Sequence, residues 1–186
     1  RLVGSEMCIR DSCIGARVAV TVGGQDKATA CRELGADVVI NYREEDFVAV
    51  LKDATNGRGV DVILDNMGAA YLERNIAALA RNGRLLIIGM QGGTQATLDI
   101  GAALRNNLTL QPSSLRGRPL AEKAAVCREV AENLWPMVTA GDVFPVIAER
   151  FPLSQAADAH RVLEAGNITG KLLLVADSSQ AQSMSA

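Results

Sequence analysis

Residues 17–42 have the pattern of a βαβ unit, the building block of open parallel sheets. An apolar strand at 17–22 is followed by Gly23-Gly24, a helical stretch at 26–34 and a second apolar strand at 38–41. In dinucleotide-binding sheets, a Gly-x-Gly-x-x-Gly motif lies on the first strand-to-helix turn. No such motif precedes this unit. The first strand of the sheet is therefore predicted to be missing, and the chain to be the C-terminal part of a larger enzyme.

The N-terminal residues 1–12 have no strand or helix period and resemble translated sequencing-adapter read-through. We predict a non-native leader and exclude it from the fold prediction. The alternative is a signal peptide, which needs an uninterrupted apolar run. Glu6, Arg10 and Asp11 interrupt this segment, so that alternative is disfavoured.

Strands and helices continue to alternate with short loops as far as residue 142. Further strands are predicted at 60–65, 84–88 and 108–111, and further helices at 46–55, 70–80 and 98–105. This rhythm predicts an α/β fold with a doubly wound parallel, Rossmann-like sheet that lacks its first strand. Aromatic residues make up only 3% of the chain. An aliphatic core of this kind suits a parallel sheet covered on both faces.

A long helix is predicted after Pro119, with Pro136 kinking or ending its last turn. Its apolar positions recur at helical period and predict one buried stripe, formed by Leu120, Ala124, Cys127, Ala131, Leu134 and Val138. Residues 143–176 depart from the earlier rhythm, with a strand at 146–150, a helix that Ser154 would cap, and a strand at 171–175. Residues 177–186 are rich in Ser, Gln and Ala, and are predicted to be disordered. The predicted domains are therefore 13–142 and the segment 143–176.

Composition excludes several function classes. The formal net charge of −2 offers no basic footprint for nucleic acid, and no apolar stretch is long enough to span a membrane. Four cysteines lack CxxC spacing and His160 is the only histidine, so no metal site is expected. Free thiols are typical of a reducing compartment, and we predict a cytoplasmic protein.

Lys27 and Tyr42 are the first candidate ligand-binding residues, because both belong to the opening βαβ unit. Enzymes that use NAD usually carry a carboxylate at this strand end, where it accepts hydrogen bonds from the adenosine ribose. Here the strand end Val22-Gly23-Gly24 is neutral, and the ammonium of Lys27 would attract a 2′-phosphate. The pattern favours NADPH over NADH. The alternative is a solvated lysine beside a packed tyrosine.

Two further candidates follow buried strands at the edge where ligands of α/β sheets bind. The first is Asp65-Asn66-Met67-Gly68, in which Asn66 could donate to a ribose hydroxyl. The second is Ile88-Gly89-Met90-Gln91. Glycine at these positions lets the backbone approach a flat ring or a ribose. Ordinary strand-end turns are the alternative interpretation.

The loop after the strand at 108–111 carries Ser113, Ser114, Leu115 and Arg116. Hydroxyl and guanidinium groups there could bind a carboxamide or a phosphate. A polar surface loop is the alternative. Asn167 and Lys171 flank the last helix-to-strand turn and could line the same cleft. No Ser-His-Asp arrangement can be assembled, and no catalytic residue is assigned.

Taken together, these residues resemble the zinc-free medium-chain dehydrogenase/reductases, and among them the NADPH:quinone oxidoreductase, zeta-crystallin-like branch. The resemblance extends in one register from about residue 15 to 176. It is carried by Leu34–Asp37, Val39–Asp46, Gly59–Asp65, Gly83–Gly89, Ser114–Arg116, Ala159–Arg161 and Gly170–Leu172.

The resemblance implies more than the residues alone. It implies hydride transfer from NADPH to a quinone or activated enone, and a GroES-like catalytic domain completed by the last segment of the chain. It implies a homodimer in which the strand at 108–111 extends the sheet between subunits. By position, the 2′-phosphate contacts fall on Lys27 and Tyr42. The ribose and nicotinamide contacts fall near Asn66, Ile88 to Gln91, and Ser113 to Leu115.

Two alternatives stay open alongside a truncated, inactive quinone reductase, and a third is disfavoured. One is a zinc-free enoyl reductase of the same superfamily. Another is a non-catalytic nucleotide-binding, dimerising fragment. The third, an AdoMet methyltransferase, would need a carboxylate at the end of the strand that closes with Val22, and none is there.

Overall fold

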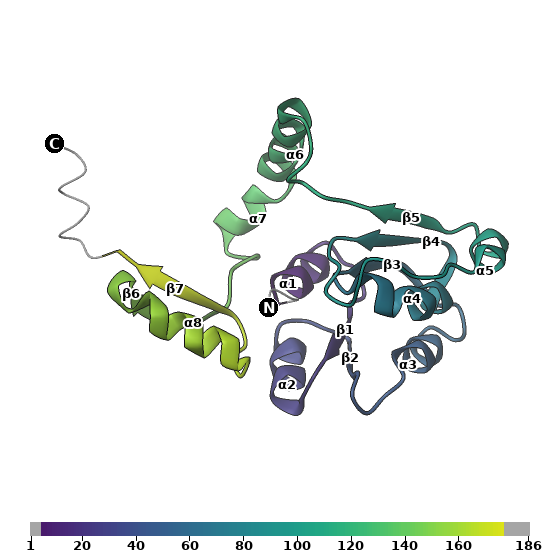
Figure 1. Cartoon of the computed structure of the whole chain (residues 1–186), viewed down its shortest axis with the longest axis horizontal. Helices are drawn as coiled ribbons and strands as arrows, with labels where there is room; N and C mark the ends of the chain where they lie inside the picture. The colour runs from purple at the N-terminus through teal and green to yellow at the C-terminus, as the bar shows by residue number, and fades with distance from the viewer. Residues whose placement is uncertain (1–4, 177–186) are drawn as a thin grey trace. The chain divides into compact units, whose positions relative to one another are not determined.

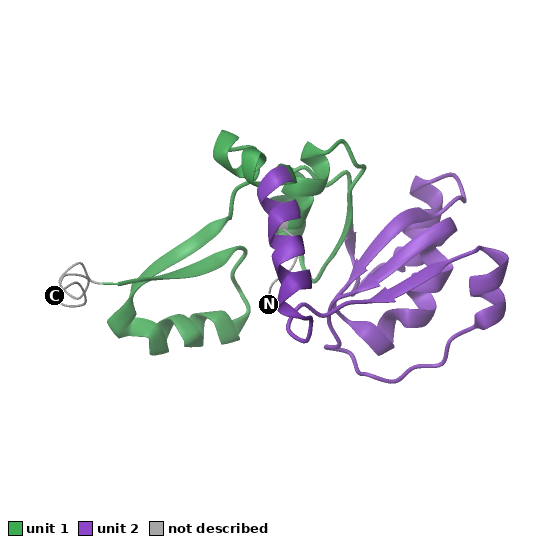
Figure 2. Cartoon of the chain, turned by 90° about the horizontal axis from the view of Figure 1, so that it is seen from above, with its two compact units in different colours: residues 1–39, 133–186 green, residues 40–132 purple. Residues whose placement is uncertain are grey.

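The structure is a computed structural model that describes residues 5–176. It divides into two compact units, which we describe separately (Figure 2): unit 1 comprises the chain up to Val39 and from Asn133 onward, and unit 2 runs from Ile40 to Glu132. The predicted disordered tail at 177–186 lies outside the described residues. The predicted boundaries at 12/13 and 142/143 stay predictions.

Unit 1 begins with a helix where no regular structure is expected. Helix α1 spans Ser5–Cys13, and its adjacent side chains Cys8 and Ile9 are buried. The expectation was wrong because a nine-residue helix contains too few turns for its period to be recognised in a polar sequence. That the segment is a non-native leader stays a prediction.

The predicted opening strand–helix–strand order is confirmed. Strand β1 (Ala19–Val22), helix α2 (Gln25–Glu33) and strand β2 (Val38–Asn41) follow one another, and β1 pairs with β2. The turn before β2 is held by Asp37, whose Oδ2 accepts a hydrogen bond from the Val18 amide at 2.7 Å.

Unit 2 is built around a three-stranded parallel sheet in the order β3-β4-β5 (Figure 1). The predicted parallel α/β class is thereby confirmed. One core cluster consists of Ile76, Leu79 and Leu85, and side chains of β3, β5, α4 and α5 pack against it. Val62 and Leu64 on β3 are exposed, so the expectation that both faces are covered is not met within this unit. The elements are α3 (Phe47–Ala54), β3 (Val60–Asp65), a 3-10 turn η1 (Gly68–Tyr71), α4 (Leu72–Ala78), β4 (Leu79–Ile87), α5 (Ile100–Arg105) and β5 (Thr109–Pro112).

The helix-to-strand junction between α4 and β4 differs from the prediction. The helix ends at Ala78 and the strand begins at once with Leu79. The chain then bulges, with Asn82 in the left-handed region at φ 63°, and pairing with β3 resumes at Arg84. Ala78, Leu79 and Ala80 are buried. Burial therefore decides this junction, although helical propensity favours continuing the helix through alanine.

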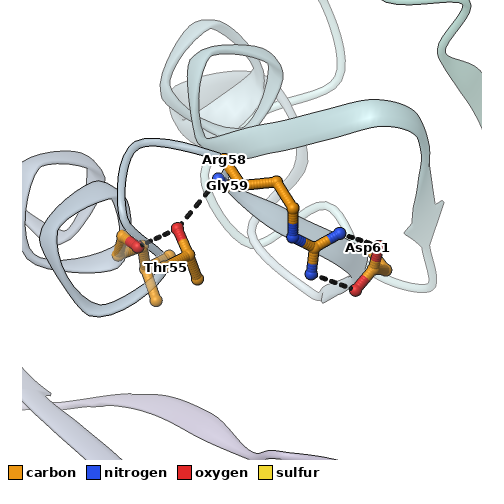
Figure 3. A network of polar contacts seen from close by, with 5 residues as sticks. Thr55, Arg58, Gly59 and Asp61 are labelled. Carbon is orange, nitrogen blue, oxygen red and sulfur yellow. Dashed lines mark hydrogen bonds and ion pairs between the residues drawn. The ribbon is translucent and has the colours of Figure 1, made fainter.

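The turn from α3 to β3 is closed by polar contacts (Figure 3). Thr55 Oγ1 donates to the Leu51 carbonyl at 2.7 Å and accepts from the Gly59 amide at 2.8 Å. Arg58 forms a two-bonded ion pair with Asp61 at 2.6 and 2.7 Å. This pair lowers the pKa of the Asp61 carboxyl, chiefly because the guanidinium donates hydrogen bonds to it. The predicted change from a helix at 46–55 to a strand at 60–65 is thereby confirmed.

The long helix predicted after Pro119 is two helices. Helix α6 covers Leu120–Asn133 and α7 covers Trp135–Ala140, with Pro136 in the first turn of α7. The proline therefore ends the first helix, as predicted. The stripe is not buried: α6 has no buried residue, and Leu120 is 82% exposed. A period of 3.6 residues shows which side chains share a face, but it does not show that another element covers that face.

The last segment of unit 1 contains two parallel strands, β6 (Ile147–Pro152) and β7 (Lys171–Val175). Between them lie the 3-10 turn η2 (Leu153–Gln155) and helix α8 (Ala156–Ala165). The N-cap of α8 is Gln155 and makes no side-chain bond, so the expected Ser154 cap is wrong. Leu173, Leu174 and Val175 are exposed. Among the described helices, none has the length and apolar character needed to cross a membrane.

A thiol pair in unit 1 yields a first prediction. The Cys8 thiol donates to Cys31, and this bond lowers the pKa of Cys31 from 9.0 to about 7. The same bond and burial raise the pKa of Cys8. Alkylation of Cys31 by iodoacetamide, followed by peptide mass spectrometry across pH, should have its midpoint near the lowered value. Cys8→Ala should move the midpoint upward. An unchanged midpoint in that variant would show that α1 does not pack against α2.

Candidate functional site

The candidate site of unit 2 lies at the carboxyl end of β3, where a buried aspartate organises the following loop. Asp65 is 5% exposed. Its Oδ1 accepts from the Met67 amide and its Oδ2 from the Gly68 amide, both at 2.8 Å. Both oxygens of the carboxylate are therefore used to shape the loop that presents Asn66.

The loop after β4 packs directly on the loop after β3. The Gln91 amide donates to the Asn66 carbonyl at 3.2 Å, and the Gly92 amide donates to the Met67 carbonyl at 2.7 Å. In return, the amides of Ala69 and Ala70 donate to the carbonyls of Gly93 and Gly92, at 3.1 and 3.2 Å. We call residues 65–70 together with 88–93 the loop junction.

Glycines make this close approach possible. A Cβ at Gly89 would lie 2.6 Å from the Asn66 carbonyl oxygen. Gly68 has φ +72°, and a Cβ there would lie 2.9 Å from the Gly93 carbonyl oxygen. These glycines were predicted to let a ligand approach the backbone. In the structure they let the backbone of the neighbouring loop approach.

Side chains of the loop junction face solvent at this edge. Ile88 is 51% and Met90 67% exposed, while Asn66 is half-buried. The amide of Ser113, which follows β5, donates to the Ile87 carbonyl at 2.9 Å. The structure therefore brings Asn66, Ile88 to Gln91 and Ser113 to one edge of one sheet. Their roles as cofactor contacts stay predictions.

The loop after β5 contains a residue that sequence reasoning missed. Arg118 donates from Nη2 to the Ser113 hydroxyl at 3.0 Å and lies 3.7 Å from the Glu122 carboxylate. Ser114, Leu115 and Arg116 are exposed in the same loop. The only signal in the sequence was the spacing of Arg118 and Glu122, which is typical of an ion pair at the start of a helix.

Other predicted residues lie in unit 1. Lys27 is half-buried in α2, and its Nζ donates to the Gly166 carbonyl at 3.0 Å. Gly166 is the left-handed C-cap of α8, so the ammonium binds a free carbonyl at a helix C-terminus. Asn167 is the next residue and is exposed, and Gly23 follows β1. Tyr42 belongs to unit 2 and is exposed, so the pairing of Lys27 with Tyr42 stays a prediction.

Metal ligands were not expected from the sequence. Within residues 5–176, no group of three His, Cys, Asp or Glu side chains lies where it could hold a metal ion.

Comparisons with known proteins relate the chain to dehydrogenases and reductases. A family model described as zinc-binding dehydrogenase matches residues 34–174. Quinone oxidoreductase 1 of Escherichia coli K12 is 32% identical over 176 residues, which cover 93% of this chain and 53% of that protein. A 2-haloacrylate reductase from a Burkholderia species is 30% identical over 166 residues, which cover 87% and 49% respectively. The chain spans about half the length of each.

Among solved structures, the E. coli quinone oxidoreductase complexed with NADPH has a TM-score of 0.77 at 32% identity, covering 93% of this chain and 53% of that one. Family match and fold agree with the resemblance inferred from the sequence. Because the family model matches well over half of the residues, the chain belongs to the zinc-binding dehydrogenase family of medium-chain dehydrogenase/reductases, with quinone oxidoreductases among its relatives.

Proposed function

We propose that this chain is the nucleotide-binding part of an NADPH-dependent quinone oxidoreductase, which transfers hydride to a quinone or an activated enone. The observation that carries the proposal is the loop junction: two strand-end loops, bonded to each other, that present Asn66, Ile88 and Met90 at the carboxyl edge of a parallel sheet. Ligands of open α/β sheets bind at this edge. When bound, the nicotinamide supplies the hydride, and the protein orients the ring.

The choice of NADPH rests on charge. Gly23 follows β1 without a carboxylate, and Lys27 supplies an ammonium on α2. The E. coli relative was solved with NADPH, which agrees with this choice. An ammonium has three donors, so Lys27 can bind a phosphate while it keeps its bond to Gly166.

The electron acceptor is less constrained than the cofactor. One relative is named for quinones and another for 2-haloacrylate, an enoate. The second name keeps the zinc-free enoyl reductase as the alternative function. Both acceptors contain an electron-poor double bond, and hydride can be transferred from the cofactor to either of them.

The chain by itself is expected to be inactive, because the resemblance assigns most of the catalytic domain to residues that are not in this sequence. The exposed apolar residues of β7 support this expectation, since they offer a surface for another part of the domain. A homodimer formed through β5, and cytoplasmic location, belong to the same proposal.

The cofactor choice can be tested in a chimaera that joins the N-terminal half of E. coli quinone oxidoreductase 1 to this chain at residue 13. With 1,4-benzoquinone as acceptor, kcat/KM should be higher for NADPH than for NADH. Lys27→Ala should reduce that preference about tenfold, because a charge-assisted bond to the 2′-phosphate is lost. Arg32→Ala is the matched control: it removes a positive charge from the exposed last turn of the same helix and should leave the preference unchanged. Equal use of both cofactors before substitution would refute the assignment.

A further inference from the structure

A buried carboxylate at the loop junction has no role in the proposed function so far. Asp65 ends β3 and is nearly inaccessible. Burying a carboxylate is costly unless hydrogen bonds satisfy it. Here two backbone amides satisfy it, and both belong to the loop it precedes. The side chain therefore acts on the backbone of its own loop.

The effect of this carboxylate extends to the next strand. Met67 bonds to Asp65 through its amide and to Gly92 through its carbonyl, at 2.8 and 2.7 Å. A single peptide segment thus connects the aspartate to the loop after β4. The space beside Gly89 and Gly68 is filled by backbone of the opposite loop, so neither loop can shift without the other.

We infer that Asp65 is a positioning residue that sets the geometry of both loops at once, and through them the dinucleotide affinity. This inference rests on the proposed function for its ligand. Asp65 would not touch the nucleotide. It would hold Asn66 on one loop, and Met90 with Gln91 on the other, at a fixed separation.

The first test uses the whole 186-residue chain without nucleotide. Asp65→Asn keeps the size of the side chain but replaces one acceptor oxygen by an NH₂ group, which cannot accept from an amide. Amide hydrogen exchange, followed by mass spectrometry, should become at least about tenfold faster in residues 66–70 and also in 89–93. Exchange within strands β3 and β4 should stay as in the unsubstituted chain.

Matched comparisons separate positioning from a general structural role. Asp61→Asn removes a carboxylate from an exposed position on the same strand and should leave both loops unchanged. Faster exchange confined to residues 66–70 would overturn the coupling. Faster exchange throughout unit 2, including Leu85, would show that Asp65 merely supports the fold, and would also overturn it.

The second test measures nucleotide binding in the chimaera defined above. Asp65→Asn should weaken NADPH and NADH binding by the same factor, about tenfold, because the aspartate acts on the ribose and nicotinamide side of the site, which both cofactors share. Unchanged affinity would overturn the inference. If the unsubstituted chimaera binds neither cofactor, both the proposed function and the effect of Asp65 on affinity are refuted. The hydrogen-exchange experiment needs no nucleotide, so it still decides whether Asp65 couples the two loops.

Discussion

Gly59→Ala is expected to lower the free energy of unfolding of unit 2 by about 3 kcal/mol or more. Gly59 has φ +91°, a conformation that alanine rarely adopts, and its Cβ would lie 2.5 Å from the Ala78 carbonyl oxygen. The atoms it would meet are backbone atoms of the α4–β4 junction, which is buried. The junction cannot rotate away as a side chain would. The substitution therefore adds a steric clash to backbone strain.

The neighbouring turn provides a control that separates these two causes. Gly57 also has positive φ, at +81°, but nothing lies within 4 Å of the Cβ it would carry. Gly57→Ala should cost only about 1–2 kcal/mol from strain. Urea unfolding followed by circular dichroism gives both values. If the two variants are equally destabilised, the α4–β4 junction does not lie against Gly59.

Strands bounded by strong turn signals were predictable from the sequence. The strands at 38–41, 60–65 and 171–175 have the predicted bounds. Each is a short apolar run that begins after a turn or a glycine-containing loop. Chain breaks of this kind depend on local backbone preferences, and sequence reports those directly.

Burial was harder to predict than secondary structure. The stripe of α6 has the right period, yet the helix is exposed. The α4–β4 junction was misplaced by a few residues because the deciding contact, between Ala78 and Gly59, joins positions distant in sequence. Periodicity describes one element at a time, and burial depends on its neighbours.

Part of the candidate site could likewise be predicted from the sequence, and part could not. Asn66 and Met90 could be placed at one edge because parallel strands share their carboxyl ends. That the two loops bond to each other could not be foreseen, since backbone hydrogen bonds between loops leave no residue pattern. Arg118 was missed for a related reason. Its long side chain extends back to hydrogen-bond Ser113, and no sequence motif predicts that contact.

Gly89→Ala is expected to disrupt the loop junction and to weaken NADPH binding by about tenfold or more in the chimaera. Gly89 needs no left-handed conformation, so the whole effect would come from the Cβ that lies 2.6 Å from the Asn66 carbonyl oxygen and 3.0 Å from its Cα. Overpacking of this kind costs about 1–3 kcal/mol of stability. The loop can relieve the clash only by moving Asn66, which is itself a predicted ribose contact.

Gly117→Ala is the matched control, because nothing lies within 4 Å of the Cβ it would carry and its φ lies outside the left-handed region. It should change neither thermal stability nor affinity. NADPH titration by fluorescence and thermal unfolding of the same samples separate the two effects of Gly89→Ala. If affinity persists while stability falls, the nucleotide does not depend on the position of Asn66, and the loop junction is a folding element rather than part of the binding site. If both fall together and the control is unaffected, the packing that lets these two loops meet is also what places the cofactor.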